Sequence, residues 1–144
     1  MTRRLFLALL ACFALPAGLH AQPKEPSLVL VASAQSVIQR LSPDETRKLY
    51  LGIPMMVDNH RIHPLRNNTD PIVQERFMQK VMFMSTPAYE RQILSRVFRM
   101  GGTRPLAYSS MPDLLKELEN DPVAVTYLPR ELATRPGLKI VGEL

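Results

Sequence analysis

The polar run Arg66-Asn67-Asn68-Thr69 has the side chains that an oxyanion site requires. An arginine guanidinium offers a planar fork of N–H donors that matches a phosphate or carboxylate, and the neighbouring amide and hydroxyl groups are neutral donors. In the competing interpretation, Arg66 pairs with a surface carboxylate and the two asparagines turn the chain. Asp70 favours this second interpretation, because its carboxylate would repel an anion. The residues alone leave both interpretations open.

A second candidate for anion binding lies in the stretch that begins at Gly101 and Gly102. Successive N–H groups from Gly101 to Thr103 can form an anion-binding concavity, and Arg104 adds positive charge. Alternatively, the two glycines only end a helix and the rest is a connector. The predicted ligand-binding residues are therefore Arg66, Asn67, Asn68, Thr69, Gly102, Thr103 and Arg104. No catalytic residue and no metal ligand is predicted.

A copper site is a minor alternative, suggested by Asp58, His60, His63 and the methionine-rich stretch FMQKVMFM. His60 and His63 are three residues apart on an expected strand, which directs them to opposite faces. The methionines recur at helical spacing, where they are more often core residues. The chain has no Gly-x-Ser-x-Gly or His-Glu-x-x-His motif. An enzyme is therefore not expected, and neither is a cofactor.

The first 21 residues have the layout of a secretory signal peptide, with two arginines, an apolar stretch and a small residue at Ala21. We expect cleavage after Ala21 and a periplasmic protein. Arg3 and Arg4 also resemble the twin-arginine export motif, so the export route stays open. Cys12 is the only cysteine and would leave with the signal, so no disulfide is expected. Residues 22–27 are expected to form a flexible leader, and residues 28–144 a single domain.

The charge balance is mildly basic, with 18 basic and 13 acidic residues and a net charge of +5. Loss of Arg3 and Arg4 with the signal lowers the basic count to 16 and the net charge to +3. Because there is no basic run, a nucleic-acid partner is not expected. A modest positive balance suits an anionic small molecule or a membrane surface.

The elements that would position these residues alternate between strands and helices. The continuous apolar run 28–33 predicts a strand covered on both faces. Ser42, Pro43 and Glu45 predict a helix start with a capping box, and Gly52 its end. Further predicted elements are a strand at 61–66, helices starting at Asp70-Pro71 and Thr86-Pro87, a helix at 111–120, and strands at 123–128 and 138–144.

Two of these helices have apolar stripes that should face the core. The predicted stripes are Val73, Phe77, Val81 and Met84 on the first, and Tyr89, Ile93 and Val97 with Leu94 and Phe98 on the second. Such alternation predicts an α/β fold with a central mixed sheet flanked by helices. In these sheets ligands bind at the carboxyl ends of strands, where the polar run is expected.

Several segments, in the same order along the chain, resemble the phosphate-binding branch of the type 2 periplasmic substrate-binding proteins of ABC importers. The resemblance runs from about Leu28 to Val141. It rests on Leu41 to Glu45, Tyr50-Leu51-Gly52, the polar run with Phe77, Phe98 to Pro105, and Pro122 to Tyr127. It implies a periplasmic-binding-protein-like domain at 28–144, in a short form equal to a single lobe.

The resemblance implies an exported phosphate- or oxyanion-binding protein, either a substrate-binding component or an accessory of a phosphate ABC import system. The implied partners are inorganic phosphate, bound weakly, and a membrane permease or envelope protein. The chain departs from the family pattern, because no glycine stands between Asn68 and Thr69, and Val123 and Thr126 replace two others. It is also about half the size of a two-lobed binder. The alternative is therefore a periplasmic protein-interaction or sensor-accessory module that kept the scaffold without binding a ligand.

Overall fold

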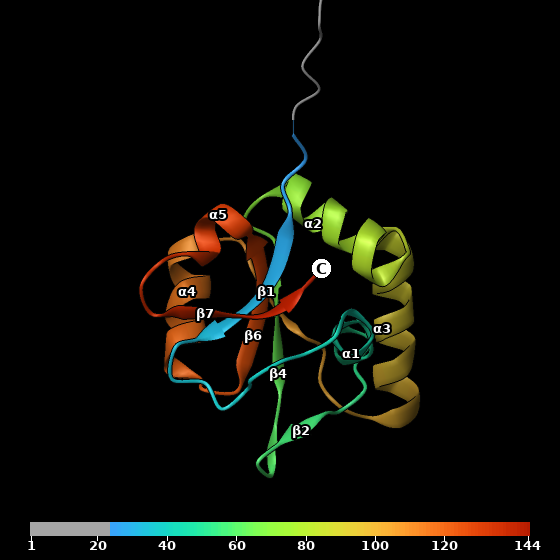
Figure 1. Ribbon diagram of the computed structural model, residues 1–144. Coiled ribbons are helices and arrows are strands. Elements are labelled where there is room, and N and C mark those ends of the chain that lie inside the picture. Colours follow the sequence, from blue (N-terminus) through green and yellow to red (C-terminus); the bar gives the residue numbers. More distant parts are fainter. Residues whose placement is uncertain (1–23) are drawn as a thin grey trace, which may run out of the picture.

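A five-stranded mixed sheet forms the centre of the computed structural model, which describes residues 24–144 (Figure 1). The strands lie in the order β5-β4-β6-β1-β7. Their bounds are β1 Leu28–Ser33, β4 His63–Asn67, β5 Leu106–Tyr108, β6 Ala124–Pro129 and β7 Leu138–Glu143. β4 is parallel to β5 and β6, whereas β1 is antiparallel to β6 and β7. The expected signal peptide, with cleavage after Ala21, lies outside the described residues.

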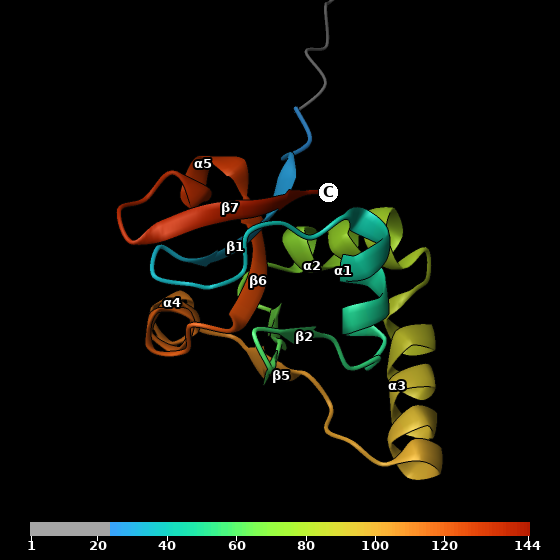
Figure 2. The same cartoon turned by 60° about the horizontal axis from the view of Figure 1, so that its bottom comes forward.

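Helices cover both faces of this sheet (Figures 1 and 2). One face carries α1 (Pro43–Tyr50), α2 (Pro71–Phe77), the π-helix η1 (Met78–Met82) and α3 (Thr86–Met100). The other carries α4 (Met111–Asn120) and α5 (Arg130–Ala133). The predicted α/β architecture with a mixed sheet between helices is confirmed. Among residues 24–144, no helix is both long and apolar enough to cross a membrane.

The strand β1 shows why a continuous apolar run belongs in the middle of such a sheet. All six of its residues are buried. Leu28 and Leu30 pack into the core under α1 and α2, while Val29 and Val31 pack into the core under α4. Because alternate side chains point to opposite faces, a strand covered on both sides has no position for a polar residue to face water.

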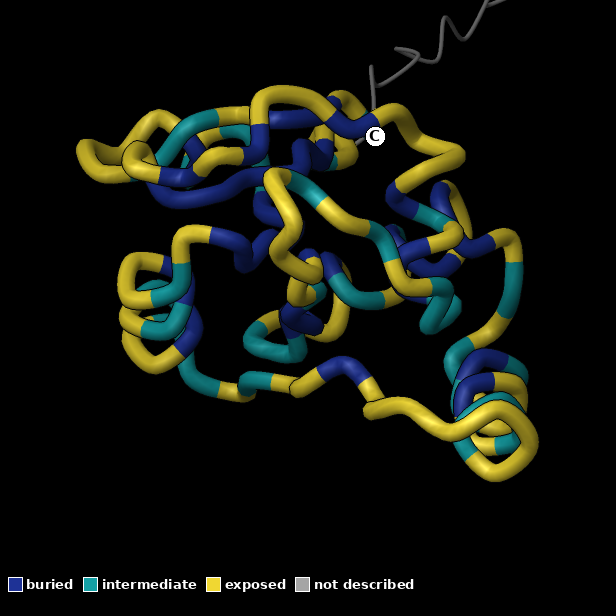
Figure 3. The backbone as a smooth tube through the Cα atoms, turned by 90° about the horizontal axis from the view of Figure 1, so that it is seen from below, coloured by how far each residue is buried: buried dark blue, intermediate teal, exposed yellow. Residues whose placement is uncertain are grey.

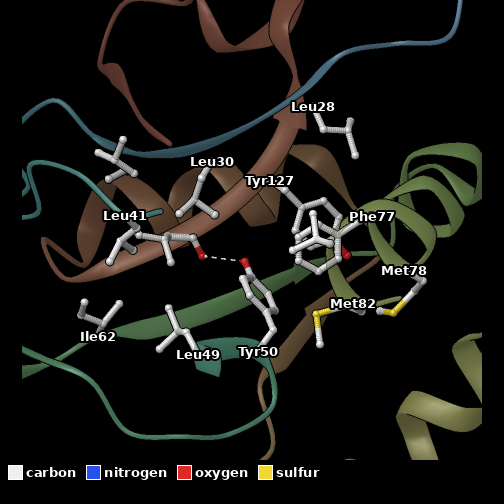
Figure 4. Close-up of a cluster of buried hydrophobic side chains, with 14 of the residues drawn as sticks. Leu28, Leu30, Leu41, Leu49, Tyr50, Ile62, Phe77, Met78, Met82 and Tyr127 are labelled. Atoms are coloured by element: carbon white, nitrogen blue, oxygen red, sulfur yellow. Dashed lines mark hydrogen bonds between the residues drawn. The ribbon is translucent and has the colours of Figure 1, made fainter. Parts of the chain in front are cut away.

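Three aromatic rings pack α1 and α2 against β6 (Figure 4). Phe77 stacks on Tyr127 with ring centroids 3.7 Å apart, and Tyr50 packs edge-on against Phe77 at 4.8 Å. The hydroxyl of Tyr50 donates to the backbone carbonyl of Leu65 at 2.9 Å. These contacts fix the end of β4, from which the polar run emerges.

The predicted capping box at the start of α1 is confirmed. The Glu45 backbone N–H donates to Ser42 Oγ at 3.2 Å, and the Ser42 backbone N–H donates to Glu45 Oε2 at 2.8 Å. These two bonds are the reciprocal capping box. Gly52 follows the end of α1 with φ of +82°, a conformation that favours glycine. At the start of α3 the cap is Ser85 rather than Thr86.

The prediction of one strand over residues 61–66 is wrong. His60–Arg61 forms β3, which pairs with β2 (Met56–Val57), and β4 begins only at His63. Asp58 and Asn59 have φ of 45° and 63°, so they form a tight turn that returns the chain into a short hairpin. An Asp-Asn pair is typical of such a turn, but a two-residue strand has too little pattern to be recognised. The three-residue β5 escaped prediction for the same reason.

The apolar stripe predicted for α3 is only half correct. Tyr89 and Ile93 are buried, but Leu94 and Phe98 are 48% and 80% exposed. The C-terminal half of α3 extends beyond the rest of the domain, and none of the described elements covers it (Figure 2). The stripe of the preceding helix is correct, although the helix changes from α to π geometry at Met78.

Candidate oxyanion site

Arg66 lies next to the last residue of β4, with its side chain on the sheet face that α3 covers. It is only 2% exposed, and it is the largest of the fully buried side chains. Its neighbour Leu65 packs on the opposite face, against the α4 side of the core. The strand period of two therefore places a charged side chain inside the domain, where it requires a partner.

That partner is Glu90 on α3. Arg66 Nη2 donates to Glu90 Oε1 at 2.6 Å, and the other carboxylate oxygen accepts from Arg104 Nη2. The side chains of Glu90 and Arg104 are 32% and 49% exposed. One carboxylate thus joins a buried arginine at the end of β4 to a half-exposed arginine in the connector before β5.

The Arg66 guanidinium has a second neighbour in Tyr89. Its central carbon lies 5.0 Å from the centre of the Tyr89 ring, within the range of a cation–π contact. Burial raises the pKa of Tyr89 to about 12, and the nearby Arg66 charge opposes that rise. Within residues 24–144, the buried Nε of Arg66 has no hydrogen-bond acceptor. The guanidinium therefore keeps a donor that the described chain does not use.

Asn67 holds the polar run in shape. Its Nδ2 donates to the Tyr127 carbonyl at 3.0 Å, which joins β4 to β6. Its Oδ1 accepts from the backbone N–H of Thr69 at 3.1 Å and from the Thr69 hydroxyl at 2.7 Å. Asn67 is fully buried, and its amide is occupied at both ends. The side chains of Asn67 and Thr69 therefore form hydrogen bonds within the protein that stabilise the loop.

Asn68 in the polar run and Asp70 after it form different hydrogen bonds. The backbone N–H of Asn68 donates to the Tyr108 carbonyl at 2.9 Å and so joins the loop to β5. Asn68 Oδ1 is buried without a partner among the described residues. Asp70 Oδ1 accepts from the Ile72 N–H at 2.8 Å. The start of α2 is therefore capped by a carboxylate of the chain itself.

Of the second predicted segment, Gly102 to Arg104, only a part lies near the polar run at 66–69. Gly101 and Gly102 have φ of 70° and 105°, and Gly101 directly follows α3, as expected for a helix end. Gly102 and Thr103 are exposed in a connector that has little cover (Figure 3). Of this segment, Arg104 is the residue that reaches the Arg66 side chain, through Glu90.

Glu90 and Tyr89 are the site residues that sequence analysis missed. Glu90 is the sole carboxylate of α3, a helix that also carries Arg91, Arg96 and Arg99. A lone acidic residue next to a core-facing tyrosine is a weak signal, but it marks a carboxylate close to the buried side of the helix. Nothing in the sequence pattern showed that it would face Arg66.

A groove of about 290 Å³ lies beside the connector, lined in part by Thr103 and Arg104. His63, on its rim, pairs through Nδ1 with Asp121 Oδ2 at 2.6 Å. His60 instead contacts the backbone carbonyl of Asp58 at 2.8 Å. The two histidines are thus separately engaged, and within residues 24–144 no three His, Cys, Asp or Glu side chains are grouped as a metal site. Met78 and Met82 are buried in the core (Figure 4).

Solved structures provide the comparison that the sequence does not. No protein-family description and no curated protein sequence matches the chain. An ABC-type phosphate transport receptor from Vibrio cholerae matches with a TM-score of 0.59 at 12% identity, over 81% of this chain and 45% of the receptor. A possible phosphate binding protein from Planctomyces limnophilus matches with a TM-score of 0.52 at 14% identity, over 81% of this chain and 40% of that protein.

The chain has the fold of a single lobe of a periplasmic binding protein. The predicted fold resemblance is confirmed, and the chain spans less than half the length of each of these two proteins. At 12% and 14% identity the likeness concerns the fold alone. What this single-lobe chain binds must be argued from its own side chains.

Proposed function

We propose that this chain is an exported oxyanion-binding protein that takes inorganic phosphate weakly between Arg66 and Arg104, as a substrate-binding component or accessory of a phosphate ABC import system. The bridge formed by Glu90 is the observation that carries this proposal. The two arginines already hold one anion through two separate oxygens. A phosphate ion offers oxygens of the same kind to the same donors.

Two further features support an anion at this position. Arg66 Nε is buried without an acceptor among the described residues, so an additional oxygen would satisfy it. The site also lies at the carboxyl end of β4, where α/β sheets commonly bind their ligands. Weak binding is expected, because the side chains of Glu90 and Arg104 are partly exposed and the attraction between charges falls with solvent screening. A dissociation constant of about 1 mM is the scale we expect.

Isothermal titration calorimetry with inorganic phosphate and with sulfate tests the proposal. Arg66→Met removes the guanidinium but keeps an apolar stem in the core, and Arg104→Ala removes the exposed arm. Arg99→Ala is the matched control, because Arg99 is an exposed arginine at the end of α3 with no ion pair among the described residues. Phosphate should bind the native chain and the control alike, and about tenfold more weakly to either site variant.

The absence of phosphate and sulfate binding to the native chain would contradict the proposal. Equal binding by the native chain and Arg66→Met would also contradict it, because the anion would then sit elsewhere. Circular dichroism of each variant establishes that a lost affinity is not lost folding.

The second candidate function is a periplasmic interaction module, and the free end of α3 favours it. Leu94, Phe98 and Met100 are 48%, 80% and 72% exposed there. Arg91 and Arg99 flank them as exposed charges. Exposed apolar side chains next to basic ones at a projecting helix end suit an acidic envelope protein.

Site-directed photo-crosslinking from position 98 in intact cells tests this candidate. A single crosslinked partner that disappears in Leu94→Ser, while Arg66→Met retains it, would support an interaction module. If a probe at position 131, on the exposed surface of α5, captures the same proteins, the α3 end has no special role.

A further inference from the structure

We propose that Glu90 is an internal competitor that occupies the oxyanion position, so that an external oxyanion binds only by displacing it. This inference rests on the proposed function and concerns the regulation of the same site. It assigns to a carboxylate of α3 the control of how tightly the site holds its ligand.

The geometry of the carboxylate is that of a bound ligand. Glu90 Oε1 accepts from Arg66 Nη2 at 2.6 Å, and Oε2 accepts from Arg104. Each oxygen therefore satisfies a different arginine, and these arginines come from separate segments of the chain. A structural ion pair on a surface helix needs only one cation, whereas this carboxylate is clamped from two sides.

Arg66 and Arg104 differ in how strongly their charges depend on a paired anion. Arg66 is 2% exposed, so its charge requires an anion next to it at all times. Arg104 is half exposed and can be solvated by water when the anion leaves. An external oxyanion that replaces Glu90 would keep the Arg66 charge paired throughout. A third-exposed glutamate has the access to solvent that such an exchange requires.

Polar atoms that the carboxylate leaves unsatisfied also point to a larger anion. Arg66 Nε is buried and unpaired among the described residues, although the guanidinium could donate from it as well. Each oxygen of the Glu90 carboxylate accepts from an arginine Nη2, and neither of them accepts from Arg66 Nε. A tetrahedral oxyanion has a third and a fourth oxygen. The site is thus incompletely satisfied by the anion that the chain itself supplies.

The net charge of the cluster indicates how neutralising Glu90 should change the affinity for phosphate. Two arginines and one glutamate leave the cluster with a single positive charge. When Glu90 is neutralised, the same cluster presents two positive charges, and a phosphate ion no longer competes with a carboxylate for the same donors. Removing one like charge a few ångströms from the ligand corresponds to an affinity gain of about tenfold or more.

The test is calorimetric titration of Glu90→Gln with inorganic phosphate. Glutamine keeps the size of the side chain and an oxygen that can accept from Arg66, so the variant should fold. The matched control is Glu75→Gln on α2, an exposed glutamate that accepts from Gln79 Nε2 and has no ion pair among residues 24–144. We expect about tenfold tighter phosphate binding by Glu90→Gln than by the native chain, no change in the control, and loss of the gain in Glu90→Gln with Arg66→Met.

The outcomes separate this inference from the proposed function. If the native chain binds phosphate but Glu90→Gln binds it equally or more weakly, the inference is overturned and the proposed function stands. If Glu90→Gln binds phosphate and the native chain does not, the inference is supported and phosphate binding by the native chain is overturned. If neither binds, both are overturned.

A second variant gives an independent measurement. Glu90→Ala leaves Arg66 buried without its anion and should melt at a lower temperature than the native chain. Added phosphate or acetate should raise the melting temperature of Glu90→Ala by several degrees more than that of the native chain. Equal shifts in the two proteins would overturn the inference, because the vacated position would then take no external anion.

Discussion

Arg66 and Arg104 bind the same carboxylate of Glu90, but from opposite kinds of surroundings. Arg66 is 2% exposed at the end of a sheet strand, and its guanidinium also faces the ring of Tyr89. Arg104 is 49% exposed in a connector that follows two glycines. The two ion pairs therefore contribute unequally to the stability of the fold. For Arg66 the anion compensates for burial, whereas for Arg104 water is an adequate substitute.

The largest expected effect comes from removing the shared anion. Glu90→Ala should lower the free energy of unfolding by about 3 kcal/mol, because it leaves Arg66 buried and unpaired. Arg104→Ala should cost less than about 1 kcal/mol, because it removes only a half-exposed pair. Urea unfolding followed by circular dichroism measures both values.

A double-mutant cycle sharpens this comparison. In a chain that already carries Arg66→Met, the cost of Glu90→Ala should fall below about 1 kcal/mol, since no buried charge is left unpaired. In a chain that carries Arg104→Ala, the cost should stay near its full value. If the cost does not depend on Arg66, burial of that charge is not what the glutamate compensates.

The two asparagines of the polar run provide a similar contrast of intermediate size. Asn67→Ala should cost about 2 kcal/mol, because it removes the bonds that join β4, β6 and Thr69 and leaves buried groups unpaired. Asn68→Ala should change stability by less than about 0.5 kcal/mol, because Asn68 Oδ1 has no partner among the described residues. Thermal unfolding of the two variants side by side makes the measurement. A larger effect at Asn68 would contradict the assignment of Asn67 as the structural member.

The effect expected at Tyr89 is smaller than that at Asn67, and it depends on pH. Tyr89→Phe removes the hydroxyl that donates to the Tyr50 carbonyl at 2.8 Å, and should cost about 1 kcal/mol at pH 7. The pKa of Tyr89 is about 12 in the folded chain, whereas an unfolded tyrosine ionises near pH 10. The native chain therefore loses the contribution of this hydroxyl as the pH rises from about 10 to 12. Unfolding measured across that range should show the gap between native and variant narrowing, and a constant gap would contradict the burial of Tyr89.

Much of the fold could be predicted, because its main elements have strong local signals. The six-residue apolar run of β1 and the capping box of Ser42 and Glu45 decide their structures almost without tertiary context. The short strands β2, β3 and β5 could not be recognised, because two or three residues form a strand only when a neighbour supplies the hydrogen bonds. The exposure of Phe98 was missed because a helical stripe shows a preferred face but not whether another element covers it.

The position of the candidate site could be predicted from the sequence, but the pairing of Arg66 with Glu90 could not. The strand pattern placed Arg66 at a strand end, and the structure agrees. Its partner Glu90 lies on another element, and pairing across elements leaves no trace in local spacing. For Arg66 the structure combines features of both sequence interpretations, because the arginine is paired with a partly exposed carboxylate and yet keeps a buried donor free among the described residues.

Arginine side-chain NMR would detect an oxyanion bound between Arg66 and Arg104 through the two guanidinium groups themselves. Phosphate would be titrated into the ¹⁵N-labelled native chain while the Nε–H resonances are followed. The Arg66 and Arg104 signals should shift together and saturate on one binding curve, while the Arg99 signal should stay unchanged. Shifts of Arg99 as large as those of Arg66, or no shift of Arg66 at all, would contradict binding between these two arginines.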